Sequence, residues 1–295
     1  MRNVHFFKAR SRIGIMNPHS TQRGYDDFGV ENGADAILTG DFLKKFPGYD
    51  AGGYSFSKPE EIEPDQFYTV LGREVGEFRE SVHKHLKPGQ TQVVLGGDHS
   101  VTLPSVLAVR DRIGGFKNLG YVQFDSHGDM NSRASSPTGN FHGMYARPLV
   151  DRIDIPEIEN LVPDKLPVEN TMYVGNLGLD PGETGLFEKK KIKNITGEAL
   201  LKDKSGVIED FKNFVLSFRY LHVTFDIDVL SKAQAPATGI PAENGLMFED
   251  IKELLRIISR HPDVSFDLTE VNPQKDGIER TVQTAQKVLS ASLLT

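Results

Sequence analysis

Short apolar runs alternate with amphipathic segments along the chain. Five of these runs are rich in β-branched residues and are apolar at both odd and even positions, which is typical of strands that helices cover on both faces. The runs occupy residues 91–97, 119–125, 171–177, 221–228 and 264–271. Their length and composition predict buried strands rather than helices.

Several of the intervening segments repeat apolar residues at the helical period. In residues 247–261, Ile251, Leu254 and Ile258 fall on one stripe of a helix. Acidic residues precede this stripe and basic residues end it, an order that suits the helix dipole. Helices are predicted in this way at residues 77–87, 206–219, 247–261 and 276–294.

Alternating strands and helices favour an α/β fold with a mostly parallel sheet and helices on both sides. The chain shows no internal repeat, low-complexity tract or linker, so we expect a single domain over residues 1–295. Ligands of such folds bind beyond the carboxyl ends of the strands. Polar residues that directly follow the apolar runs are therefore candidates for a site.

Ionisable residues end three of the apolar runs. They are His99 after the first run, Asp125, His127 and Asp129 after the second, and Asp226 and Asp228 at the end of the fourth. Side chains two positions apart share one face of a strand, so those after the second run converge if the strand continues through them. One such triplet alone could be a polar strand end, but three endings of this kind favour a common site.

Four carboxylates in one small volume repel each other and raise each other's pKa. Divalent cations remove this conflict, and oxygen and imidazole ligands without sulfur suit manganese or a similar ion. Six ligands exceed what one ion takes from protein while keeping a water position open. The pattern therefore predicts two bridged ions, roughly 3.5–4 Å apart, which turn a bridging water into a hydroxide nucleophile.

Composition narrows the class of protein further. The chain has no Cys, which excludes thiolate metal ligands, disulfides and cysteine nucleophiles. A formal net charge of −7 argues against a nucleic-acid partner. The apolar runs are too short to span a bilayer and the first residues lack a signal-peptide core, so we expect a cytoplasmic protein with no membrane partner.

Five motifs connect these residues with a known family: GGDHS, DSHGDMN, GNFHGM, FDIDVL and LTEVNP. In their order and approximate spacing they resemble the ureohydrolases, dimanganese enzymes that include arginase, agmatinase and formiminoglutamase, and arginase most of all. The resemblance covers essentially the whole chain. It implies one three-layer α/β/α sandwich with a central, mainly parallel eight-stranded sheet, and a homo-oligomer that is a trimer or a hexamer.

The resemblance also implies roles for individual residues. One manganese ion would be held by His99, Asp125, Asp129 and Asp226, and the other by Asp125, His127, Asp226 and Asp228. His142 matches the proton shuttle of the family, and Glu270 matches the carboxylate that pairs with the substrate guanidinium. We predict that Asp129 is a catalytic residue together with His142 and Glu270.

Similarity to arginase implies that the substrate is L-arginine, which a metal-bridging hydroxide would cleave to L-ornithine and urea. Short polar side chains are expected to bind the substrate carboxylate, and two acids its α-amino group. The first set is Asn131, Thr138 and Asn140, and the second is Asp180 and Glu183.

The residues leave other functions possible. Agmatinase, formiminoglutamase and other guanidino-acid hydrolases are alternatives, formiminoglutamase because Arg133 could serve another carboxylate. The chain departs from the family pattern at Ser231, Ile240 and the pair Leu177-Gly178, so an inactive scaffold is also an alternative. A two-metal phosphoesterase is disfavoured because no Gly-rich phosphate cradle lies beside the ligands.

Overall fold

The computed structural model describes residues 2–15 and 27–294. In this part of the chain, eight strands form one sheet in the order β2-β1-β3-β8-β7-β4-β5-β6, and every pairing is parallel. The strands are β1 Asn3–Arg10, β2 Asp50–Ser55, β3 Gln90–Gly96, β4 Leu119–Phe124, β5 Thr171–Val174, β6 Lys193–Ile195, β7 Tyr220–Asp226 and β8 Val264–Thr269. The predicted α/β fold with an eight-stranded, mainly parallel sheet is confirmed.

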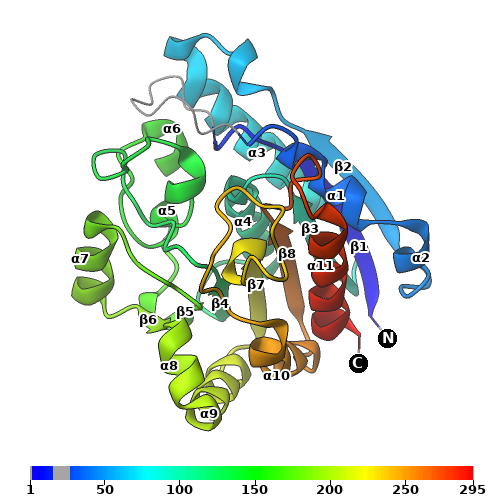
Figure 1. Ribbon diagram of the computed structural model, residues 1–295. Coiled ribbons are helices and arrows are strands. Elements are labelled where there is room, and N and C mark those ends of the chain that lie inside the picture. The colour runs from blue at the N-terminus through cyan, green and yellow to red at the C-terminus, as the bar shows by residue number, and fades with distance from the viewer. Residues whose placement is uncertain (1, 16–26, 295) are drawn as a thin grey trace.

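Helices cover both faces of the sheet and give the molecule three layers (Figure 1). One face packs against α1 Gly33–Ile37, α2 Gly40–Leu43, α8 Gly197–Lys202, α9 Lys204–Leu216, α10 Phe248–Ser259 and α11 Ile278–Leu293. The other face packs against α3 Phe67–His85, α4 Thr102–Ile113, α5 Arg147–Val150, α6 Pro156–Glu159 and α7 Pro181–Lys190. Short 3-10 helices are η1 Val30–Asn32, η2 Pro59–Glu61, η3 Pro64–Gln66, η4 His99–Val101, η5 Phe141–Met144, η6 Val168–Asn170 and η7 Ile227–Val229.

Successive residues of the central strands point into different hydrophobic clusters. Val93 and Leu95 of β3 lie in the first cluster, whereas Val94 lies in the second. In β4, Val122 and Tyr121 divide in the same way. Each fully buried aliphatic side chain contributes roughly 1.5–3 kcal/mol. Burial on both faces therefore explains why the runs that predicted these strands are apolar at both parities.

The five predicted strands are confirmed as β3, β4, β5, β7 and β8, whereas β1, β2 and β6 were not predicted. β2 and β6 are the two edges of the sheet, where one side has no neighbouring strand and a continuous apolar run is not needed. β2 alternates half-buried and exposed residues, and β6 has three residues. β1 carries Lys8 and Arg10, which both contact Asp35 of α1, so charges hid this strand.

The four predicted helices are confirmed as α3, α9, α10 and α11. α3 begins at Phe67, ten residues before the start that the sequence predicted. α9 ends at Leu216, so Phe218, which falls within the predicted range 206–219, lies outside the helix. The Phe218 ring still packs edge-on against Phe214, with ring centroids 5.0 Å apart. It also covers Gly120, where a Cβ would come within 2.5 Å of the ring.

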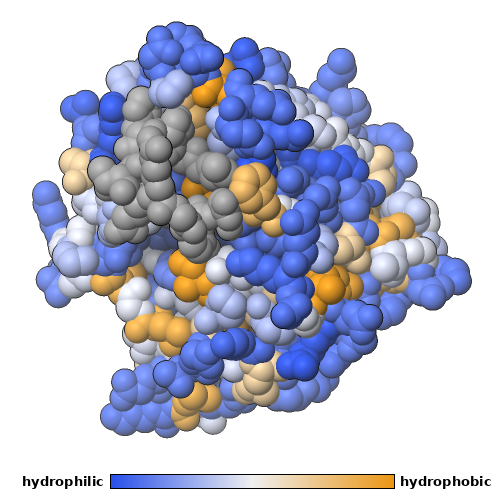
Figure 2. All heavy atoms as spheres, turned by 45° about the horizontal axis from the view of Figure 1, so that its top comes forward, coloured by the Kyte–Doolittle hydropathy of each residue, from blue (hydrophilic) through white to orange (hydrophobic). Residues whose placement is uncertain are grey.

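Figure 2 shows one face of the molecule, which is mainly hydrophilic and on which the hydrophobic residues form small separate groups. The large hydrophobic side chains that are exposed include Leu201, Leu216 and Ile240. Within residues 2–15 and 27–294, none of the helices combines the length and apolar character that crossing a bilayer requires.

Candidate active site

The candidate residues lie at the carboxyl edge of β3, β8, β7 and β4, which adjoin in the sheet. His99 begins η4 shortly after β3, and Glu270 follows β8. Asp226 ends β7, Asp228 lies in η7, and Asp125 follows β4. Because the four strands run parallel, residues that are far apart in the sequence meet at this edge.

The chain turns sharply after β4. This strand ends at Phe124, so the condition under which the side chains would share one strand face, a strand that continues through Asp129, is not met. The backbone N–H of His127 donates to Oδ1 of Asp125 at 2.7 Å, and Nδ2 of Asn176 donates to the Asp125 carbonyl at 3.0 Å. Asp129 has a φ of 50°, a left-handed conformation that few residues other than glycine adopt. A turn, not a strand, therefore brings the three side chains of this segment to one site.

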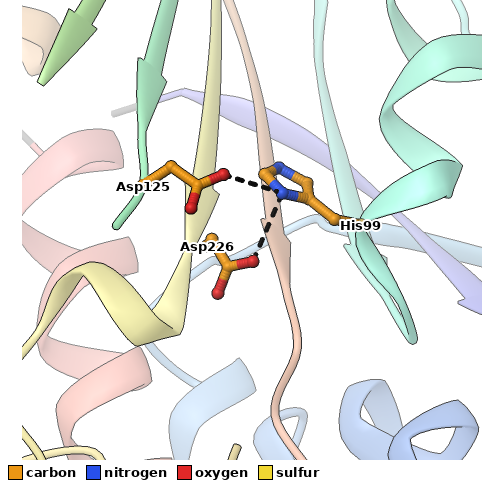
Figure 3. Close-up of side chains that lie close together, drawn as sticks. All are labelled: His99, Asp125 and Asp226. Atoms are coloured by element: carbon orange, nitrogen blue, oxygen red, sulfur yellow. Dashed lines mark ion pairs between the residues drawn. The ribbon is translucent and has the colours of Figure 1, made fainter. Parts of the chain in front are cut away.

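The imidazole of His99 lies among three carboxylates. The distances from its Nδ1 to the nearest carboxylate oxygens are 3.2 Å for Asp125, 2.8 Å for Asp129 and 3.2 Å for Asp226. Figure 3 shows His99, Asp125 and Asp226 directed toward one another from three different elements. His99 and Asp125 are almost completely buried.

A second group shares Asp125 with the first. Nδ1 of His127 lies 3.5 Å from Oδ1 of Asp125 and 3.1 Å from Oδ2 of Asp228. The backbone N–H of Asp228 donates to Oδ1 of Asp226 at 2.8 Å, which ties the two groups together. The site thus contains two adjacent sets of oxygen and imidazole donors, His99–Asp125–Asp226 and Asp125–His127–Asp228, each within 4.8 Å.

Burial and mutual repulsion act strongly on the carboxylates of these groups. Burial and the charge of Asp125 raise the pKa of Asp129 to about 7. Burial and neighbouring carboxylates also raise the pKa of Asp226 well above its usual value. Burial raises the pKa of Asp125 too, but hydrogen bonds with His127 and His99 outweigh it and hold that pKa low. A cluster of this kind is unfavourable unless positive charge compensates it.

The donor atoms fit divalent cations. Nδ1 of His99 is buried and makes no hydrogen bond, although three carboxylates lie within 3.2 Å of it. An unpartnered buried nitrogen is costly, and a cation between the imidazole and the carboxylates would satisfy both. Carboxylate oxygens and imidazole nitrogens without thiolates are the ligands that manganese and similar ions take.

A cavity of about 280 Å³ opens over these groups. Among the described residues it is lined by His127, Asp129, Asn131, Ser136, Pro137, Thr138, His142, Gly143, Gly178, Asp180, Glu183, Asp226, Asp228, Thr238, Ile240 and Glu270. His99 and Asp125 lie beneath the lining. Asn140 is buried and is not among the lining residues, so its contact with substrate stays a prediction.

Glu270 and His142 lie side by side in the lining of the cavity. Nδ1 of His142 lies 3.4 Å from Oε1 of Glu270, and this same oxygen accepts the backbone N–H of His99 at 2.7 Å. Burial lowers the pKa of His142, but the hydrogen bond and the charge of Glu270 outweigh it and raise that pKa. Burial raises the pKa of Glu270, an effect that His142 only partly offsets.

Asp180 and Glu183 form a capping box at the start of α7. The Asp180 N–H donates to Oε2 of Glu183 at 3.0 Å, and the Met130 N–H donates to Oε1 at 2.8 Å. Nδ2 of Asn131 donates to Oδ2 of Asp180 at 2.8 Å. Burial raises the pKa of Glu183 to about 7. Both acids are therefore held in place by the backbone and by Asn131 while they line the cavity.

Arg133 lies apart from the cavity. Its guanidinium stacks on the ring of Tyr68, 4.9 Å from the centroid, and it is not among the described lining residues. Formiminoglutamase had been an alternative because Arg133 could bind another carboxylate of the substrate. The position of Arg133 removes this reason.

Sequence reasoning missed the buried polar side chains beneath the metal cluster. Gln123 contacts Asp125, and Tyr145 contacts His99. One signal was present, because Gln123 and Thr224 are polar residues inside otherwise apolar runs. Sequence reasoning also did not assign Ser136, Pro137, Gly143 and Thr238 to the site, since their places depend on how the loops fold over it.

Known proteins match this chain along most of its length. The model of the Arginase family matches residues 18–295. Arginase of Staphylococcus aureus strain COL is 31% identical over 214 residues, which cover 70% of this chain and 69% of that protein. Arginase of Bacillus subtilis strain 168 is 27% identical over 282 residues, which cover 90% and 92%. The crystal structure of Entamoeba histolytica arginase in complex with L-ornithine has a TM-score of 0.86 at 23% identity, covering 100% and 99% of the two chains.

The parallel sheet, with imidazoles and carboxylates gathered at its carboxyl edge, and these matches define the class of protein, a metal-dependent hydrolase that acts on a guanidino C–N bond. Within this class, the chain belongs to the arginase family.

Proposed function

We propose that the protein is an arginase, which hydrolyses L-arginine to L-ornithine and urea with two Mn²⁺ ions. One observation carries the proposal. A single cavity is lined by His127, Asp129, Asp226 and Asp228 of the imidazole–carboxylate cluster, by the Glu270 carboxylate and by the acids Asp180 and Glu183. The cluster suits metal ions, Glu270 suits a guanidinium, and the two acids suit an α-amino group.

Two adjacent ions would share Asp125 and Asp226. His99 and Asp129 would complete the ligands of one ion, and His127 and Asp228 those of the other. The distances within the cluster support this division, because each Nδ1 faces its own set of carboxylates. When bound, the ions supply an activated water as the nucleophile.

Glu270 would bind and orient the guanidinium of the substrate. A carboxylate pairs with a planar guanidinium through charge-assisted hydrogen bonds. One Glu270 oxygen is held by the backbone N–H of His99, so the substrate is positioned relative to a metal ligand. A guanidinium close to Glu270 would favour its ionised form and oppose the effect of burial on its pKa.

His142 would deliver a proton to the leaving amine. Glu270 raises the pKa of His142, which favours the protonated form of the imidazole. Its backbone N–H donates to the carbonyl of Gly14 at 3.0 Å, and Glu270 lies on its Nδ1 side. The first contact holds the backbone of His142, and the second places its ring beside Glu270, where the substrate guanidinium would bind.

Asp180 and Glu183 would bind the α-amino group of an amino-acid substrate. Asn131 gives one amide N–H to Asp180, so we propose that it acts partly by orienting this acid. The hydroxyl of Thr138 accepts the Asn140 N–H at 3.1 Å and keeps its own proton for a substrate carboxylate. This polar end of the cavity favours L-arginine over agmatine, which has no carboxylate.

The resemblance to arginase also supports a homo-oligomer, either a trimer or a hexamer, and a location in the cytoplasm. Sedimentation velocity of the full-length protein would measure the mass of the assembly. A monomeric species at all concentrations would contradict the oligomer.

A panel of substrates tests the proposed activity. Urea release, or formamide release for formiminoglutamate, would be measured with L-arginine, agmatine, guanidinobutyrate and formiminoglutamate on the Mn²⁺-loaded protein. We expect the highest kcat/KM for L-arginine. A higher kcat/KM for another member of the panel would assign that substrate instead. Manganese bound at two ions per chain without turnover of any member would support an inactive scaffold.

A further inference from the structure

A continuous chain of hydrogen bonds links His99 to Asp125 beneath the candidate metal centre. Nε2 of His99 lies 3.0 Å from the Tyr145 hydroxyl, which lies 3.1 Å from the Tyr121 hydroxyl. The Tyr121 hydroxyl donates to Oε1 of Gln123 at 2.8 Å, and Nε2 of Gln123 donates to Oδ2 of Asp125 at 2.8 Å. All five side chains are buried, none with more than 1% of its surface exposed. No solvent therefore competes for these bonds.

The direction of every bond follows from the Asp125 end. A carboxylate only accepts hydrogen bonds, so Gln123 must present its amide N–H₂ to Asp125 and its Oε1 to Tyr121. The Tyr121 hydroxyl then donates its single proton to Oε1 of Gln123. The Tyr145 hydroxyl must therefore donate to the oxygen of Tyr121.

This order decides which nitrogen of His99 carries a proton. Because the Tyr145 proton points to Tyr121, the contact between Tyr145 and His99 is a hydrogen bond only if Nε2 of His99 donates. A neutral imidazole protonated at Nε2 has a bare lone pair at Nδ1. Nδ1 is the atom that faces Asp125, Asp129 and Asp226 without a hydrogen bond.

We propose that Tyr145, Tyr121 and Gln123 are positioning residues that hold Nδ1 of His99 bare and Asp125 oriented for a divalent cation. The inference rests on the proposed metal centre and adds to it residues that touch neither metal nor substrate. Partners of this kind set the tautomer and ring orientation of metal-ligating histidines.

Thr224 extends the same arrangement. Its Oγ1 lies 2.8 Å from Nε2 of His99 and 2.9 Å from Oγ1 of Thr102. Because Nε2 carries a single proton, Thr224 and Tyr145 can only share it in a bifurcated bond, and Thr224 then donates its own proton to Thr102. The Tyr145 contact supplies the direction, whereas Thr224 is compatible with it.

The chain offers a matched control for the test. Tyr173 is also fully buried, and its ring lies beside that of Tyr121, with centroids 6.4 Å apart. Its hydroxyl makes no hydrogen bond. Tyr145→Phe and Tyr173→Phe thus remove the same buried hydroxyl group, once from the line of hydrogen bonds and once beside it.

Mn²⁺ binding to the metal-stripped full-length protein would be measured by calorimetry for the wild type and both variants. We expect Tyr145→Phe to lower the affinity for one ion by roughly tenfold or more, the range found for such partners, and Tyr173→Phe to leave both ions unchanged. In a His99→Ala background, Tyr145→Phe should have no further effect, because it acts through His99. Equal Mn²⁺ affinities of Tyr145→Phe and Tyr173→Phe would overturn the inference. It would also be overturned if Tyr145→Phe lowered Mn²⁺ affinity as much in the His99→Ala background as in the wild type.

Gln123→Glu tests the direction from the other end. Glutamate keeps an acceptor for Tyr121 but presents a second acceptor to Asp125, so Mn²⁺ affinity should fall while the metal-free protein remains folded by circular dichroism. Unchanged affinity in this variant would overturn the inference even if Tyr145→Phe does not fold. If the wild-type protein binds no Mn²⁺, this result would instead contradict the proposed metal centre itself.

Discussion

Glu270 accepts a hydrogen bond from the backbone N–H of His99 at 2.7 Å, although the two residues lie 171 positions apart in the chain. The bond exists because β3 and β8 are parallel neighbours and both residues follow the carboxyl ends of these strands. Glu270 holds a left-handed φ of 65°, an uncommon conformation that costs energy in a non-glycine residue. The carboxylate proposed to bind substrate is thus fixed to the backbone of a proposed metal ligand.

We expect Glu270→Gln to lower kcat/KM for L-arginine about 10–100-fold, because a hydrogen bond to a charged group is worth about 1.5–3 kcal/mol. Manganese content should stay at the wild-type value, since Glu270 is not a proposed ligand. Steady-state urea release and metal analysis check both parts. The exposed Glu169→Gln is the control, and wild-type kcat/KM in Glu270→Gln would contradict the role.

His142→Ala should lower kcat roughly 10²–10⁴-fold, the usual contribution of a positioned general acid. KM should change less, because the imidazole acts on the leaving group. Added imidazole should restore part of the lost rate. His83→Ala, on the exposed face of α3, is the control. A His142→Ala enzyme with full kcat, or one that imidazole does not restore, argues against proton delivery.

The acidic cluster should oppose folding when no cation is bound. Burial and the charge of Asp125 raise the pKa of Asp129 to about 7, so ionised Asp129 is costly at pH 8 in the metal-free protein. We therefore expect Asp129→Asn to raise the Tm of the metal-free protein at pH 8 and to weaken Mn²⁺ binding. Thermal unfolding with and without Mn²⁺ measures both effects, with the exposed Asp276→Asn as control. A lower Tm of metal-free Asp129→Asn would show that repulsion is not the dominant force.

An ion pair between α3 and α4 should make stability depend on pH. Nε and Nη2 of Arg79 donate to the two oxygens of Asp111 at 2.6 and 2.8 Å. Burial raises the pKa of Asp111, but the hydrogen bonds with Arg79 and Arg110 outweigh it and lower that pKa. The stabilisation is thus complete above the unfolded pKa of about 3.9 and is lost as pH falls through the lower folded value.

Asp111→Asn should therefore lower the free energy of unfolding by roughly 0.5–1 kcal/mol at pH 7. The difference from the wild type should shrink below about pH 4. Urea unfolding at pH 7 and pH 3.5 tests this, with Asp41→Asn in an exposed pair as control. A difference of the same size at both pH values would contradict the linkage.

Two glycines should respond to alanine in opposite directions. A Cβ at Gly97 would lie 1.8 Å from the Ser11 carbonyl oxygen, whereas a Cβ at Gly185 in α7 meets nothing within 4 Å. Gly97→Ala should cost about 1–3 kcal/mol or more and disturb the Glu270 N–H bond to the Gly97 carbonyl. Gly185→Ala should stabilise by roughly 0.5–1 kcal/mol. Urea unfolding measures both changes, and a neutral Gly97→Ala would contradict the close approach.

Patterns along the chain were sufficient for the central strands and the main helices. Strands buried on both faces must be apolar at every position, so residues 91–97 and 221–228 are recognisable without any neighbour. The edge strands β2 and β6 have no such requirement and were not recognised. β1 was missed because Lys8 and Arg10 reach Asp35, a partner that only the folded chain places beside them.

The order of acids and histidines along the chain was enough to predict an imidazole–carboxylate site, because residues that end apolar runs lie at the carboxyl edge of a parallel sheet. The arrangement of these side chains within the site became known only from the fold. The turn from Asp125 to Asp129, the stacking of Arg133 on Tyr68 and the line from Tyr145 to Gln123 depend on contacts between distant segments. Local spacing cannot encode such contacts, because the direction of a side chain in a loop is set by the partners that fold against it.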